Sequence, residues 1–126
     1  MCYSHKKVTN VDKEIVMQEN NSKKVEHSDC PVTYCMGQIG GKWKPIIIYL
    51  IRKGANRFGI LERGIEGITK QMLTKQLREM EADGILTRTI YPEIPPRVEY
   101  FFTDYGQSLF PVIDAMSDWG LSKMSH

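Results

Sequence analysis

The chain has 126 residues, of which 41% are hydrophobic and 25% are charged, values typical of one globular domain. No apolar run approaches the roughly 18 residues of a membrane-spanning helix, and the first residues lack a signal-peptide stretch. We therefore expect a cytoplasmic protein whose three cysteines are reduced. The net charge of +2 is uneven, because residues 42–57 hold five basic and no acidic side chains. Such a segment is typical of a surface that binds an acidic partner.

The N-terminal third divides into a polar arm and a helix. Residues 1–28 show only a weak helical pattern, which predicts a flexible arm. Pro31 suits the first position of a helix, and a glycine pair at 40–41 ends the segment, so a helix is predicted over 29–39. Its inward face is predicted to consist of Val32, Cys35, Met36 and Ile39.

The next segment, "KWKPIIIYLIRKG", has two interpretations. Its β-branched residues are typical of a strand, whereas Pro45 at the start and Gly54 at the end favour a short buried helix. Periodicity alone leaves both open. "NRFGILERGIEGIT" then predicts a short strand or turn at 57–59 and a short helix. The inward residues of that helix are predicted to be Ile60, Leu61 and Ile65.

Residues 69–82 give the clearest helical signal in the chain. Thr69 is a plausible cap, and Leu73, Leu77 and Met80 form an inward stripe. Two strands are predicted after it, at 86–91 and 98–103, joined by the proline-rich turn "PEIPPR". A last helix is predicted over 104–120, with a kink at Pro111. Its apolar positions have a coiled-coil-like spacing of 4, 3, 4 and 3: Tyr105, Leu109, Val112, Met116 and Trp119.

This order of elements predicts an α+β, mostly α fold, a winged helix-turn-helix with a two-stranded wing and flanking helices. The recognition helix is then 69–82, the wing 86–103 and the dimerisation helix 104–120, within a domain at 29–126. Side chains that suit base edges or phosphates lie on one face of the predicted recognition helix, namely Gln71, Thr74, Lys75 and Arg78, and Lys70 lies at its first turn. Candidate phosphate contacts elsewhere are Lys42, Lys44, Arg57 and Arg97.

The chain from residue 30 to residue 120 resembles the HxlR-type winged helix-turn-helix regulators of bacteria. The resemblance is carried by "CPV", "IGGKWK", "RFGIL", "GITKQMLTKQLREMEADGIL", "YPEIPPRVEYFFTDYGQSL" and the tryptophan at 119. It implies a dimeric regulator that binds double-stranded DNA, favours helix for "IIIYLI", and assigns the terminal helix to the dimer contact. The resemblance ends before residue 30.

Cys30 is the candidate sensor that the resemblance implies, because matching cysteines in the family sense oxidants or electrophiles such as quinones and aldehydes. A position at a helix start also favours a thiolate. Cys35 is expected to pack in the core, and a metal site with His27 matches no common zinc spacing, so no metal or other cofactor is predicted.

Two other functions stay open at this point. A winged helix can serve protein–protein contact without DNA, because fold alone does not fix function. A thiol redox enzyme using Cys30 is the weaker alternative, because the sequence has no CxxC pair and no obvious base. The main prediction is therefore a homodimeric transcription regulator without enzymatic activity.

Overall fold

The computed structural model describes residues 29–124, which divide between Gly37 and Gln38 into two compact units. The predicted arm at 1–28 lies outside the described residues. Helix α2 (Pro31–Ile39) begins at its proline, as predicted, and belongs mostly to the first unit. Of its predicted inward residues Ile39 is buried, whereas Val32 and Met36 are exposed, so the expectation of a fully buried apolar face was wrong.

The second unit begins with three helices, α3 (Lys44–Arg52), α4 (Phe58–Gly64) and α5 (Lys70–Ala82). Helix α3 confirms the helical interpretation of the isoleucine run, with Pro45 in its first turn and Ile47, Ile48 and Ile51 buried. Beyond it, Gly54 adopts a φ of 106°, a conformation that side chains with a Cβ rarely take. Helix α4 starts earlier than predicted, and Ile60 on it is exposed rather than inward.

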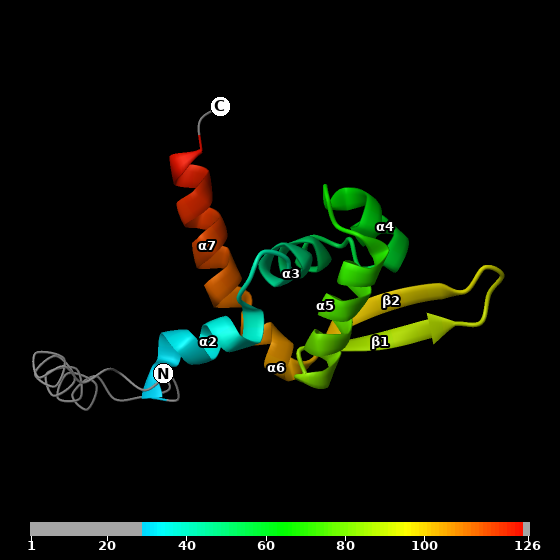
Figure 1. The fold of residues 1–126 in the computed structure, drawn as a ribbon, viewed down its shortest axis with the longest axis horizontal. Coiled ribbons are helices and arrows are strands. Elements are labelled where there is room, and N and C mark those ends of the chain that lie inside the picture. The colour runs from blue at the N-terminus through cyan, green and yellow to red at the C-terminus, as the bar shows by residue number, and fades with distance from the viewer. Residues whose placement is uncertain (1–28, 125–126) are drawn as a thin grey trace, which may run out of the picture. The chain divides into compact units, whose positions relative to one another are not determined.

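A two-stranded antiparallel wing follows α5, formed by β1 (Leu86–Tyr91) and β2 (Arg97–Phe102) (Figure 1). The register pairs Leu86 with Phe102 and Tyr91 with Arg97. Each predicted strand is confirmed, with the second one residue earlier than expected. The start of α4 is tied to β2, because the Tyr100 amide donates to the Asn56 carbonyl at 2.9 Å and Arg57 forms a bridge with Glu99.

The predicted helix at 104–120 is divided in two, α6 (Asp104–Gln107) and α7 (Phe110–Lys123). Pro111 explains the break, since it lacks the amide hydrogen that a helix interior requires and instead occupies the first turn of α7. Thr103 caps α6, its hydroxyl accepting from the Gly106 amide at 2.9 Å. Figure 1 shows α7 running away from α4, α5 and the wing.

The core of the second unit lies where α3, α4, α5 and the start of β1 meet. It is wholly apolar, because no polar or charged residue of the described chain is buried. The side chains with no exposed surface are those of Ile47, Ile48, Leu61, Leu73, Leu77, Met80 and Ile85. This core fixes the orientation of α5 against the helix before it, which is the requirement of a helix-turn-helix.

Candidate nucleic-acid interface

Helix α5 presents the predicted recognition face. The Thr69 hydroxyl accepts from the Met72 amide at 3.0 Å, which confirms the predicted cap. Because Leu73, Leu77 and Met80 are fully buried, the opposite side of the helix is left for solvent. The five predicted contacts lie on this helix: Lys70, Gln71, Lys75 and Arg78 are exposed, and Thr74 is half-buried.

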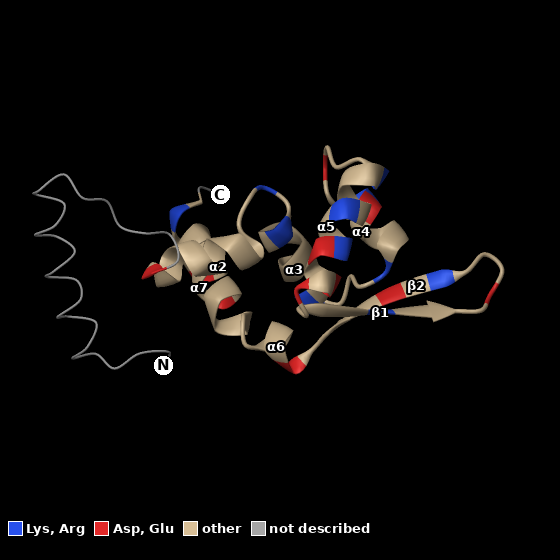
Figure 2. Ribbon diagram, turned by 60° about the horizontal axis from the view of Figure 1, so that its bottom comes forward, with Lys and Arg blue, Asp and Glu red and all other residues tan. Residues whose placement is uncertain are grey.

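Acidic side chains on the same helix are held away by internal ion pairs. Glu79 Oε1 lies 2.7 Å from Lys44 Nζ, and Glu81 Oε2 lies 3.6 Å from Arg88 Nε. The hydrogen bond and positive charge of Lys44 hold the pKa of Glu79 below its usual value, which favours the carboxylate form of Glu79. The outer face of α5 therefore keeps its positive character although acidic and basic segments alternate along the helix (Figure 2).

Two of the predicted phosphate contacts have partners inside the protein. The Lys44 side chain is only 12% exposed and pairs with Glu79, so the structure shows it holding α3 to α5. The guanidinium of Arg97 lies 3.3 Å from Glu93 and 3.5 Å from Glu99 and stacks on the ring of Tyr91. Both therefore have less free charge for DNA than the sequence suggested.

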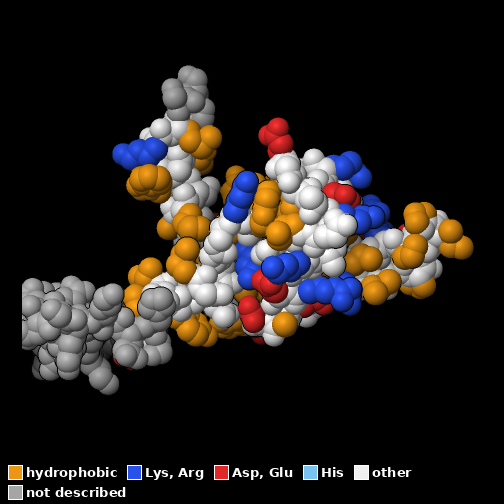
Figure 3. Space-filling view, in the orientation of Figure 1, with side chains coloured by type: hydrophobic (Ala, Val, Ile, Leu, Met, Phe, Trp, Pro, Cys, Tyr) orange, Lys and Arg blue, Asp and Glu red, His pale blue; other side chains and the backbone are white. Residues whose placement is uncertain are grey.

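Lys42 and Arg57 are exposed and have no ion pair among the described residues. Lys42 Nζ lies 4.7 Å from the ring centroid of Trp43, a cation–π contact that leaves its charge accessible. Figure 3 shows Lys and Arg side chains over the α3–α5 part of the surface, and hydrophobic ones along α7 and on the wing. Hydrophobic and acidic side chains lie among the basic ones over this part of the surface, and α7 carries Lys123 in its last turn.

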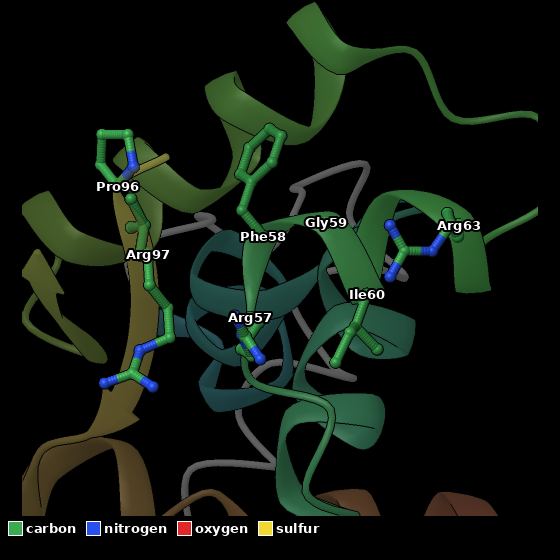
Figure 4. Close-up of a pocket in the computed structure, with 8 residues that line it drawn as sticks. Arg57, Phe58, Gly59, Ile60, Arg63, Pro96 and Arg97 are labelled. Atoms are coloured by element: carbon green, nitrogen blue, oxygen red, sulfur yellow. The ribbon is translucent and has the colours of Figure 1, made fainter. Parts of the chain in front are cut away.

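Arg63 is a further exposed basic residue without an ion pair among the described residues, and it was not predicted. It lines a pocket of about 410 Å³ between α4 and the wing together with Arg57 and Arg97 (Figure 4). The sequence predicted only a short helix here, with Ile60, Leu61 and Ile65 inward, and its polar residues were given no role. The signal that could have found Arg63 is its i, i+4 spacing from Gly59, which leaves room for a side chain over the helix.

The predicted dimer seam lies on α7 and the preceding turn. Val112, Met116 and Trp119 are 36%, 45% and 68% exposed, so this protomer does not bury them. Tyr105 belongs to α6, where its hydroxyl donates to Gln38 Oε1 at 2.8 Å, and Leu109 is half-buried at the start of α7. One uninterrupted helical seam was therefore the wrong expectation, although three of its five members share an open face of α7.

Cys30 lies directly before α2, and its Sγ accepts from the Thr33 amide at 3.5 Å. Hydrogen bonds from Thr33, first from its hydroxyl and then from its amide, lower the pKa of the Cys30 thiol. Cys30 and Cys35 are both free thiols and both half-buried. Among residues 29–124, no group of three or more His, Cys, Asp or Glu side chains could hold a metal ion.

Comparison with known proteins bears directly on this arrangement. An HTH-type transcriptional regulator of Methanothermobacter thermautotrophicus is 44% identical over 77% of this chain and 74% of its own length. The HTH-type transcriptional regulator YybR of Bacillus subtilis is 43% identical over 84% of this chain and 85% of its own. The structure of the redox regulator HypR in its oxidised form superposes with a TM-score of 0.71 at 45% identity, covering 77% of this chain and all of that one.

Within the described part of the chain, no helix has the length and apolarity needed to cross a membrane. The model of the HxlR-like helix-turn-helix family matches residues 38–126, which begin close to the boundary between the two structural units. The relatives are transcriptional regulators rather than enzymes. The chain therefore belongs to the HxlR-like helix-turn-helix family and is a winged-helix transcriptional regulator.

Proposed function

We propose that the protein binds a palindromic operator as a homodimer and reads it with α5. The observation that carries this is the exposed polar face of α5, where Gln71, Lys75 and Arg78 are free while Glu79 and Glu81 are tied to internal partners. Arg and Lys suit guanine edges or phosphates and Gln suits adenine, so one helix offers both direct readout and charge. The capped N-terminus of α5 adds backbone amides suited to a phosphate.

Dimerisation increases the number of base pairs that the protein can contact. A single recognition helix contacts few base pairs, whereas two related by twofold symmetry reach half-sites about 10 base pairs apart or a multiple of this. The exposed stripe of Val112, Met116 and Trp119 on α7 supports this arrangement, because a protein of this size has no internal use for it. A twofold pairing of α7 with its copy would bury the stripe.

Replacing Arg78 or Lys75 by alanine is expected to weaken operator binding about tenfold, because each change removes a charged side chain that binds a base or phosphate. Fluorescence anisotropy on the DNA upstream of the protein's own gene, repeated at several salt concentrations, measures both affinity and salt slope. The slope should fall by about 1 for each phosphate that the variant no longer neutralises. Lys123→Ala, at the far end of α7, is the control and should bind as the wild type does. Unchanged affinity and slope in both α5 variants would remove α5 from the interface.

We further propose that Cys30 switches DNA binding when it is oxidised or alkylated. The support is its hydrogen bonding to Thr33, which stabilises the thiolate, and the likeness to a redox regulator in its oxidised form. Modification of a thiol changes local charge and packing, and such a change can bias a two-state arrangement of a dimer.

The double variant Cys2→Ser, Cys35→Ser keeps Cys30 as its one cysteine. We expect the rate of its alkylation by iodoacetamide to reach half its maximum at a pH below that for an ordinary cysteine. The sign follows from the lowered pKa, since the reactive thiolate then persists to lower pH. Cys30→Ser should keep operator affinity and lose the response to diamide or quinone. A response that survives in Cys30→Ser, or a midpoint at or above that of free cysteine, would contradict the sensor role.

A further inference from the structure

The pocket between α4 and the wing gathers three arginines from different parts of the chain. Arg57 precedes α4, Arg63 is in its last turn, and Arg97 begins β2. The hydrogen bond from Tyr100 to Asn56, at 2.9 Å, and the bridge from Arg57 to Glu99 hold this corner together. These backbone contacts hold the start of α4 against β2, and Pro96 of the turn between the strands completes the lining.

Its lining contains no acidic side chain, and consists otherwise of glycine, proline and apolar residues. Arg97 is already balanced by Glu93 and Glu99, but Arg57 and Arg63 have no ion pair among the described residues. Two unbalanced guanidinium groups on one concave surface repel each other and concentrate a positive potential. This arrangement suits a bound anion that both can share.

The Arg63 side chain is positioned for this by a glycine one turn earlier. Its Nη1 atom lies 3.3 Å from the place that a Cβ would occupy on Gly59, so the guanidinium lies back over the helix (Figure 4). Any larger residue at 59 would occupy that place. Gly59 itself is helical and needs no unusual φ, so room for Arg63 is what this position provides.

We propose that this pocket holds one backbone phosphate of the bound DNA, with Arg57 and Arg63 as its two donors. Guanidinium groups form short, charge-assisted hydrogen bonds with phosphate oxygens, and two of them on one phosphate fix its position. This proposal rests on the proposed function, because the phosphate site would orient the protein on the DNA that α5 reads. Arg63 is a positioning contact and carries no sequence information, since the phosphate is common to every base.

The test compares Arg57→Gln, Arg63→Gln and the double variant of the full chain, by anisotropy on the upstream operator and on a scrambled duplex of equal length. Either arginine alone still neutralises a shared phosphate, so each single variant should weaken binding about tenfold on both duplexes with little change in salt slope. The double variant should bind still more weakly, with the slope reduced by about 0.9. Lys123→Gln is the control, and thermal melts confirm folding.

Gly59→Ala gives a second, independent measurement. A Cβ at this position requires the Arg63 guanidinium to shift by only a few tenths of an ångström, so we expect a small weakening of binding in the wild-type background and none in the Arg63→Gln background. A slope reduction near 0.9 in each single variant would mean two separate phosphates and overturn the shared site. Wild-type affinity in Arg63→Gln, with Arg78→Ala still impaired, would overturn the pocket alone. Failure of the wild type to bind any duplex would overturn the proposed function itself.

Discussion

Gly106→Ala is expected to destabilise the protein severely. A Cβ at this buried position would lie 2.1 Å from the carbonyl oxygen of Ile85 and 3.1 Å from its carbonyl carbon. That carbonyl accepts from the Thr103 amide at 3.1 Å, so the backbone cannot retreat without losing the junction between β1 and α6. Overpacking against flexible side chains costs about 1–3 kcal/mol, and against fixed backbone we expect about 3 kcal/mol or more.

The measurement is the melting temperature, which should fall by at least about 10 °C for a domain of this size. Gly37→Ala is the matched control, because it places the same methyl group on a helix where no atom lies within 4 Å. Alanine is the better helix former, so that variant should melt at or slightly above the wild-type temperature. A Gly106→Ala protein that melts within about 2 °C of the wild type would show that the junction can yield.

Trp119→Asp should separate the proposed dimer while leaving each chain folded. The Trp119 side chain is 68% exposed, so the protomer loses little by the change, whereas a charge in an apolar interface is costly. Buried interface tryptophans contribute about 2 kcal/mol or more, which corresponds to a weakening of dimerisation by at least about 30-fold. Operator affinity should fall by about 100-fold or more, because two half-sites can no longer be bound together.

Analytical ultracentrifugation across protein concentrations measures the dimerisation, and anisotropy on the operator measures its effect on binding. Asp118→Lys is the control, because it changes the charge of α7 by more than Trp119→Asp does. Asp118 is not part of the stripe of Val112, Met116 and Trp119, so this variant should remain dimeric. A Trp119→Asp protein that sediments as a dimer would exclude this face of α7 as the contact. A large fall in its melting temperature at low protein concentration would instead place Trp119 in the core of its own protomer.

The local patterns predicted most of the elements because each is determined within a few residues. Thr69, the buried stripe of α5 and the proline-rich turn are short-range signals, and the structure confirms the helix and both strands. The isoleucine run was ambiguous because three adjacent β-branched residues suit a strand, and Pro45 and Gly54 decided it for helix. The regular apolar spacing continues across the boundary between α6 and α7, so it did not predict that boundary. Periodicity does not detect the missing amide hydrogen of Pro111.

The site was harder to predict because it depends on pairs distant in sequence. Lys44 and Glu79 are 35 positions apart, and only their 2.7 Å contact shows that Lys44 serves the fold. The grouping of Arg57 with Arg63 and Arg97 depends on the hydrogen bond between Tyr100 and Asn56, which no periodic pattern encodes. The exposed face of α5 could be predicted because a helix fixes the relative directions of its own side chains.

Thr103 links parts of the protein that are expected to serve different functions. Its hydroxyl donates to the Gly84 carbonyl, just past the end of α5, and accepts from the Gly106 amide in α6, while its own amide donates to Ile85. The end of α5, which we propose reads the DNA, and the start of α6 are thus joined through one side chain, without passing along the wing. In the proposed dimer, a rotation of α7 that carries α6 with it would have to break these bonds or turn α5 as well. The spacing between the two proposed recognition helices would then depend on how the two copies of α7 pack.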